Sequence, residues 1–362
     1  MSDAPRPRRL LMLVLVGLLL ASCSRPSPPV TPNGAAVPPA ITGEQVAPAA
    51  PNNARPRSDG IAGRLLFAHN GTVWLWQGDE PRPLIATGNA WQPAWSPDGE
   101  RIAYVARGQS YSDLVLANAN GQTVAEVTAN SSDYPLQSNE RIYDTMWAFY
   151  PVWSPDGRTL YALSQPGKPY GAPATDYPLT LFAWDLTPSG GGVTQLLSDA
   201  YANLGRFALH PNGNELIFTR TTLRVDGDQR LHRLDLATET VEPYPGTPYR
   251  SYDPAFSPDG RWLVYTARQE NQTDLWVLPG NAPSGTTPVP QRLTTLGTAR
   301  APVFAPDGSK LAFLAVPPDA PRFELWIVDL SVSETGALQA GPPRQMTAKM
   351  GIDPDSGLTW SE

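Results

Sequence analysis

A seven-residue phrase, Pro-Ala-Trp-Ser-Pro-Asp-Gly at 93–99, recurs along the chain and limits the folds open to it. Close copies lie at 151–157, 254–260 and 302–308, and a more divergent copy, Phe-Ala-Leu-His-Pro-Asn-Gly, lies at 207–213. Ser-Pro-Asp-Gly is typical of a tight turn, because proline fixes φ, aspartate suits the third position and glycine accepts a positive φ. An alternating apolar run follows each phrase. Each copy therefore predicts two antiparallel strands joined by a turn.

The residues around the first phrase predict four strands, at 93–96, 101–107, 113–118 and 122–128. Strands of this length, with a period of two and Gly, Pro, Asn or Asp between them, continue along the body of the chain, and no helical period is evident. Four antiparallel strands in each repeat are typical of a propeller blade. Because a single repeat cannot bury its own faces, we expect one all-β array rather than two domains.

The spacing of the repeats predicts how many blades there are. The apolar residues that precede the turns are 47 to 58 positions apart, at Trp95, Trp153, Leu209, Phe256, Phe304 and finally Trp360. The strand expected at 358–361 has no partner after it, whereas the strands expected at 64–68 and 72–76 have no innermost strand before them. We therefore expect the C-terminal strand to join the N-terminal three. This closure gives a six-bladed β-propeller of four-stranded antiparallel blades over residues 61–362 and leaves no open edge.

The turns and the apolar pair after each of them resemble the WD40-like repeats of TolB-type six-bladed propellers. Ile102 with Tyr104 and Leu263 with Tyr265 are two such pairs, and the resemblance covers nearly all of residues 63–362. It implies a range of functions: periplasmic proteins of envelope integrity that contact peptidoglycan-associated lipoproteins, propeller domains of serine peptidases, and metal-dependent lyases. The chain differs from TolB itself, because a proline-rich segment stands where TolB has an α/β domain.

Residues 1–22 predict a lipoprotein signal peptide. Three arginines precede an apolar run at 10–20 that is too short to span a bilayer, and Leu-Ala-Ser-Cys at 20–23 resembles a lipobox, in which the cysteine is acylated and the chain is cut before it. Cys23 is the only cysteine in the sequence, so it has no partner for an intramolecular disulfide. The alternative is an ordinary secretory signal with an incidental cysteine.

Residues 23–60 predict a tether that starts at lipidated Cys23. The segment contains nine prolines among Ala, Asn, Ser and Gly and has no apolar periodicity. Together with the signal, it predicts an extracytoplasmic protein anchored to the membrane, either periplasmic or at the cell surface. The net charge of −7 and the lack of a basic stripe exclude a nucleic-acid partner.

The chemistry needed for an enzyme is sparse in this sequence. The three histidines, His69, His210 and His232, fall on different parts of the predicted blades, and there is no Gly-x-Ser-x-Gly motif. These observations disfavour a serine or cysteine peptidase, and we predict no catalytic residues, metal or cofactor. The acidic pairs at 226–228 and 353–355 lack the ligand number and spacing of a known calcium loop, which favours turns.

Two long insertions are expected side by side on one rim of the second blade, at 129–150 and 165–178. In a four-stranded blade, the connection entering the blade and the loop joining its second and third strands lie on the same face. The insertions carry seven aromatic residues: Tyr134, Tyr143, Trp147, Phe149, Tyr150, Tyr170 and Tyr177. Aromatic side chains on loops held by a rigid scaffold favour a recognition surface. The alternative is that they pack on one another and cover the blade.

Further candidates for partner binding precede the innermost strands and should converge at the mouth of the central channel: Trp91, Arg206, Tyr252, Asp253 and Arg300. We therefore predict a monomeric, non-enzymatic binding or scaffolding lipoprotein of the bacterial envelope, with an envelope protein or peptide as its partner. Two alternatives are a carbohydrate- or peptide-binding module of an uptake or sensing system, and a degenerate propeller enzyme resembling a metal-dependent lyase.

Overall fold

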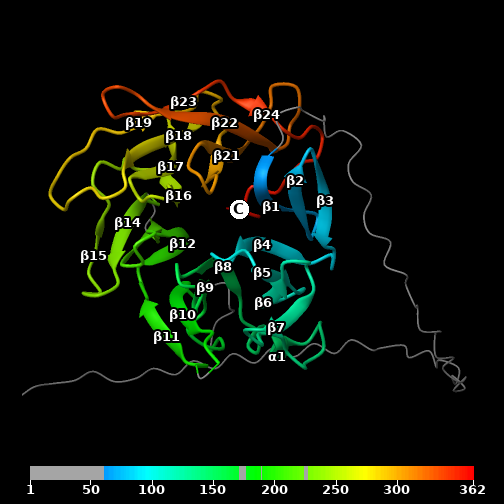
Figure 1. Ribbon diagram of the computed structural model, residues 1–362. Coiled ribbons are helices and arrows are strands. Elements are labelled where there is room, and N and C mark those ends of the chain that lie inside the picture. The colour runs from blue at the N-terminus through cyan, green and yellow to red at the C-terminus, as the bar shows by residue number, and fades with distance from the viewer. Residues whose placement is uncertain (1–60, 171–176, 189, 224–226) are drawn as a thin grey trace, which may run out of the picture. The chain divides into compact units, whose positions relative to one another are not determined.

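The computed structural model describes residues 61–170, 177–188, 190–223 and 227–362. Within them the chain forms six antiparallel sheets arranged as a ring around a central axis (Figure 1). The predicted all-β, six-bladed propeller is therefore confirmed. The signal peptide at 1–22 and the tether at 23–60 lie outside the described residues and stay predictions. Among the described residues, no helix is both long enough and apolar enough to cross a membrane.

The blades are numbered along the chain, each from its innermost strand outward. Blade 1 has β4 (Ala90–Trp95), β5 (Arg101–Arg107), β6 (Ser112–Asn118) and β7 (Thr123–Glu126). Blade 2 has β8 (Ala148–Trp153), β9 (Thr159–Ser164), β10 (Thr180–Asp185) and β11 (Val193–Leu197). Blade 3 has β12 (Ala202–Leu209), β13 (Glu215–Thr222), β14 (Gln229–Asp235) and β15 (Val241–Pro243).

Blade 4 has β16 (Ser251–Phe256), β17 (Trp262–Gln269), β18 (Gln272–Pro279) and β19 (Gln291–Arg292). Blade 5 has β20 (Arg300–Phe304), β21 (Lys310–Ala315), β22 (Glu324–Val332) and β23 (Leu338–Ala340), and β24 (Arg344–Gln345) also pairs with β22. The shared blade has β25 (Leu358–Ser361), β1 (Ile61–His69), β2 (Thr72–Gly78) and β3 (Glu80–Ile85).

The ring closes through the C-terminal strand, as the sequence predicts. β25 pairs antiparallel with β1, in a register that places Leu65 opposite Trp360. Side chains reinforce the pairing, because the Trp360 indole donates to the Ala62 carbonyl at 2.8 Å and Arg64 Nε donates to the Glu362 carbonyl at 2.7 Å. The C-terminus consequently lies near the centre of the ring (Figure 1).

The repeated turns have the geometry that their composition predicts. In blade 1, the Ser96 hydroxyl donates to Asp98 at 2.5 Å, the Glu100 N–H donates to the same carboxylate at 3.1 Å, and Gly99 has a φ of 67°. The hydrogen bond from Ser96 lowers the pKa of Asp98 from its usual value. The divergent turn of blade 3 keeps the arrangement with a neutral side chain, since Asn212 accepts from the Asn214 N–H at 2.9 Å. These aspartates are therefore turn residues.

The core lies between neighbouring blades. One buried cluster joins the shared blade to blade 1 through Leu66, Val73, Trp95, Ile102 and Tyr104, all less than a tenth exposed. Comparable clusters fill the other gaps between blades. Because each apolar face is buried by the next blade, the stability of a blade depends on its neighbours.

One feature was missed by the sequence prediction. A four-residue helix, α1 (Asn139–Ile142), lies in the insertion that enters blade 2. Its N-cap is Ser138, whose hydroxyl accepts from the Arg141 N–H at 3.3 Å. A helix of about one turn leaves no periodic apolar pattern, so the sequence gives no signal for it.

Candidate functional site

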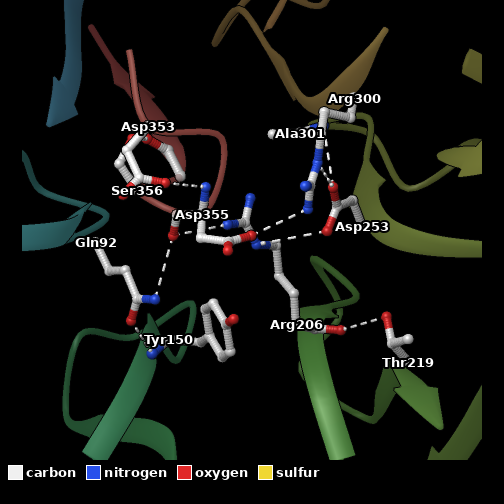
Figure 2. Close-up of polar contacts among 11 residues, drawn as sticks. Gln92, Tyr150, Arg206, Thr219, Asp253, Arg300, Ala301, Asp353, Asp355 and Ser356 are labelled. Carbon is white, nitrogen blue, oxygen red and sulfur yellow. Dashed lines mark hydrogen bonds and ion pairs between the residues drawn. The ribbon is translucent and has the colours of Figure 1, made fainter. Parts of the chain in front are cut away.

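Five of the six innermost strands have a β-bulge at the end where they enter the blades. Their register shifts lie between Trp91 and Ala94 in β4, with equivalent shifts in β8, β12, β16 and β20. Residues inside these bulges have a positive φ, 49° at Gln92, 56° at Tyr150 and 51° at Asp253. A bulge redirects a side chain, and non-glycine residues in this conformation are strained and cluster at functional sites. Here the bulges direct Gln92, Tyr150 and Asp253 toward the mouth of the channel (Figure 2).

Behind the mouth lies a channel of about 650 Å³. In four blades the residue after the positive-φ position of the bulge is a proline, at Pro93, Pro151, Pro254 and Pro302, and these prolines line the channel. Proline is tolerated there because the inner edge of an innermost strand has no neighbouring strand to accept its N–H. These prolines make much of the channel wall apolar.

Two arginines and two aspartates form a charge network across the mouth (Figure 2). Asp253, which is 4% exposed, accepts from Arg300 Nε at 3.1 Å and lies 3.7 Å from Arg206 Nε. Arg300 Nη2 also lies 3.2 Å from the carboxylate of Asp355. Burial alone would lower the pKa of Arg300, but Asp253 and Asp355 raise it above its ordinary value. The two positive and two negative charges therefore balance within the network.

Polar and aromatic side chains attach the 353–357 segment, which leads into β25, to this network. The backbone carbonyl of Asp355 accepts from Gln92 Nε2 at 3.2 Å and from Arg206 Nη2 at 3.1 Å. The Arg206 guanidinium stacks 5.3 Å from the Tyr150 ring, and the Tyr150 N–H donates to Gln92 Oε1 at 2.8 Å. Burial raises the pKa of Tyr150. The segment is thus held over the mouth by three different blades.

Four of the five residues predicted at the mouth come together there. Arg206, Asp253 and Arg300 form the network, and the ring of Tyr252 lies 5.4 Å from the Arg300 guanidinium. Trp91 is the exception, although it occupies the same place beside the bulge as Tyr252 and Arg300 do. Its ring packs 4.4 Å below the Arg107 guanidinium and against the core between blades 1 and 2. The prediction that Trp91 belongs to this convergent set is therefore wrong.

Gln92 and Asp355 are mouth residues that the sequence reasoning missed. Gln92 and Asp253 both stand three residues before the apolar residue of the repeated turn, so aligning the copies of the phrase could have found Gln92. Asp355 was assigned only to a turn. The structure confirms that turn, in which the Asp355 N–H donates to Asp353 Oδ1 at 2.9 Å, and also brings its side chain to Arg300.

The two insertions, here called the blade 2 rim (residues 129–150 and 165–178), lie side by side as predicted. Lys168 of one insertion forms an ion pair with Asp144 of the other. The Trp147 N–H also donates to Gln165 Oε1. Residues 171–176 lie outside the described part of the chain. These contacts join the two insertions to each other.

The predicted rim aromatics divide into exposed and packed residues. Tyr170 is 92% exposed, and Tyr134 and Tyr143 are also exposed. The Tyr177 hydroxyl accepts from the Tyr170 N–H at 2.8 Å and donates to the Tyr170 carbonyl, which fixes the backbone below the exposed ring.

The other rim aromatics are partly buried. Trp147 and Phe149 stack on each other with centroids 6.0 Å apart. Tyr150 lies in β8 with the mouth residues, so its assignment to the rim is corrected. The bulge in β8 is the physical reason, because it turns Tyr150 toward the channel.

The histidines lie apart, as the sequence indicates. His69 ends β1, His210 lies in the blade 3 turn against Phe256, and His232 lies in β14 beside Phe218. Across the ranges that the structure describes, no group of three or more His, Cys, Asp or Glu side chains is placed to hold a metal ion. Asp226, from one of the two acidic pairs, lies outside those ranges.

No family model matches the chain, and no curated protein matches it. Among solved structures, TolB from Acinetobacter baumannii superposes with a TM-score of 0.59 and 18% identity, over 83% of this chain and 66% of that chain. A chain of the nidogen/laminin complex superposes with a TM-score of 0.54 and 10% identity, over 83% of this chain and 99% of that chain. The chain thus spans just under two thirds of the TolB chain. At these identities the likeness confirms the TolB-like propeller fold alone.

Proposed function

We propose that this protein is a membrane-anchored, extracytoplasmic lipoprotein whose propeller binds an envelope protein or peptide and catalyses no reaction. The observation that supports this proposal best is the placement of the mouth network and the blade 2 rim on one face of the ring. Ala148, at the start of β8, pairs with Ser164, where the second insertion begins, so both insertions leave the blade at the mouth end. One face therefore carries exposed tyrosines beside a balanced set of charges.

The rim has the physical properties of a recognition surface. Tyrosine adds a large contact area with few rotatable bonds, so it loses little conformational entropy on binding. The contacts of Tyr177 and the Lys168–Asp144 ion pair hold the loops in place before a partner arrives, which lowers the ordering cost of association. The TolB-like fold and the lipobox-like stretch at 20–23 support an envelope location.

Replacing two exposed rim tyrosines tests the binding surface. We expect Tyr143→Ala combined with Tyr170→Ala to leave the melting temperature within about 2 °C of the wild type, because surface changes cost little stability. Partner binding should weaken by about 2 kcal/mol or more, as expected for hot-spot residues. Affinity capture from native envelopes identifies the partner, and titration with that partner measures the change in Kd.

Tyr249→Ala is the matched control, since Tyr249 is an exposed tyrosine on the connection between blades 3 and 4. It should leave this partner bound as before. Full binding by the double variant would contradict the rim assignment. A large loss of melting temperature in that variant would instead support the alternative, in which the tyrosines cover blade 2.

The anchor is tested separately at Cys23. We expect mass spectrometry of the mature N-terminus to show acylated Cys23 with at least two acyl chains, because one chain gives only marginal membrane attachment. Cys23→Ala should move the protein out of the membrane fraction, whereas the control Ser27→Ala in the tether should not. A mature N-terminus beyond residue 23 would refute the lipid anchor and leave the rim proposal untouched.

A further inference from the structure

A second concave region lies on blade 3, apart from the mouth and the blade 2 rim. It has a volume of about 670 Å³, and we call it the blade 3 cleft. It is lined chiefly by Tyr201, Arg220, Asp228, Gln229, Tyr249 and Arg250. These residues come from the facing ends of β12, β13 and β14 and from the connection between β15 and β16. The cleft is as large as the channel. Its lining is aromatic and charged, whereas prolines make much of the channel wall apolar.

Two tyrosines of the cleft are largely open to solvent. Tyr201 is 80% exposed and Tyr249 is 66% exposed. The Arg230 guanidinium lies 5.8 Å from the centre of the Tyr249 ring and supports it. Exposed tyrosine rings bordering a polar cleft suit a ligand with apolar C–H faces and polar edges, because the ring stacks on one and the polar groups bind the other. Sugar rings have this composition.

The wall of the cleft includes an acceptor that lacks a donor. Asp228 Oδ1 is buried and has no hydrogen-bond partner among the described residues. The backbone of Asp228 is fixed by Thr222, whose hydroxyl accepts from the Asp228 N–H at 3.0 Å. Leaving a buried carboxylate oxygen unpaired is unfavourable. A hydroxyl donor on a ligand in the cleft would pair with this oxygen once the Asp228 side chain turns toward the cleft.

The cleft also offers a cation. The Arg220 Nε atom lies 2.7 Å from Asp199, so that charge is matched within the protein. Arg250 is exposed, has a φ of 61°, and forms no ion pair with another described residue. Its backbone is fixed by a hydrogen bond from its N–H to the Gln229 carbonyl at 2.6 Å. The guanidinium of an exposed arginine suits a planar carboxylate, which it binds through two parallel hydrogen bonds.

We propose that the blade 3 cleft binds a carboxylated saccharide. Tyr201 and Tyr249 stack on sugar rings, Asp228 accepts from a sugar hydroxyl, and Arg250 pairs with the carboxylate. The cleft lies at the same end of its blade as the mouth, but it shares no residue with the mouth network or the blade 2 rim and takes a different ligand, so either proposal can fail without the other.

The test is titration calorimetry on the full chain with two acidic probes, tri-galacturonate and a hyaluronan hexasaccharide. Each probe is matched to its carboxyl-reduced form, which keeps the rings and hydroxyls and lacks the charge. We expect at least one acidic probe to bind at least tenfold more tightly than its reduced form. Tyr249→Ala should weaken binding of that probe by tenfold or more, and the control Val289→Ala, at an exposed apolar side chain outside both proposed sites, should not weaken it.

Arg250→Ala distinguishes charge recognition from general stacking. It should bring the affinity for the acidic probe to within about threefold of that for the reduced form, while both still bind. Both cleft residues are exposed, so melting temperatures are expected to stay near that of the wild type, and this is measured on the same samples. Lack of binding by both acidic probes, equal binding of acidic and reduced forms, or unchanged discrimination in Arg250→Ala would overturn the proposal.

Discussion

Deleting residues 357–362 should lower the melting temperature by about 10 °C or more, or leave insoluble protein. The deletion removes β25, whose four residues pair with β1 from Arg64 to Phe67. About four net hydrogen bonds at roughly 1 kcal/mol each are lost. Losing the buried apolar contacts of the Trp360 side chain costs about 2–3 kcal/mol more. This sum rivals a typical stability of about 5–15 kcal/mol. Calorimetry of the full chain and the truncated chain measures the effect.

Two controls separate closure of the ring from general damage. Removing only Glu362 keeps β25 and its pairing with β1, so it should shift the melting temperature by no more than about 2 °C. Adding a synthetic peptide of residues 353–362 to the truncated chain should restore part of the lost stability, because the peptide can occupy the vacant innermost strand position. A truncated chain that melts like the full chain would refute the shared blade as a source of stability.

The fold could be predicted because its strongest signals are local and repeated. The turn chemistry of residues 96–99 depends on four neighbouring residues, and its recurrence gives the number of blades. The predicted bounds of β5 and β25 coincide with those observed. β4 was predicted to start at 93 and starts at Ala90, because the bulge at Gln92 interrupts the alternation on which the prediction relied.

The candidate site was less predictable, because it depends on the direction of single side chains. Trp91 and Gln92 are neighbours in sequence, yet Gln92 reaches the mouth network, whereas the partly buried Trp91 packs against the core between blades 1 and 2. The equivalent neighbours Tyr252 and Asp253 both reach the mouth, so position along the strand alone cannot decide which side chains converge there. Asp355 joins the network through a distant pairing, since β25 brings it beside residues about 55 to 260 positions earlier. No local sequence pattern predicts a contact between residues so far apart in the chain.

Asp253→Ala should lower the free energy of unfolding by about 3 kcal/mol, a large effect for one substitution. The carboxylate of Asp253 is buried between the guanidinium groups of Arg206 and Arg300. Removing it leaves two partly buried positive charges facing each other, and breaking a buried pair by removing one partner costs about 3–5 kcal/mol. The lower end of that range applies because both arginines keep some contact with solvent. Chemical denaturation with urea measures the change.

Asp355→Ala is the matched control, because Asp355 pairs with the same Arg300 while its side chain is 56% exposed. An exposed pair contributes about 0–1 kcal/mol, and the Asp355 carbonyl that accepts from Gln92 and Arg206 remains in the variant. Asp253→Asn then separates charge from backbone strain, since asparagine tolerates the positive φ of the bulge as aspartate does. We expect Asp253→Asn to lose most of the free energy of unfolding that Asp253→Ala loses, because a neutral amide still leaves the arginines without a buried counter-charge. Equal and small effects at positions 253 and 355 would show that burial adds nothing to this network.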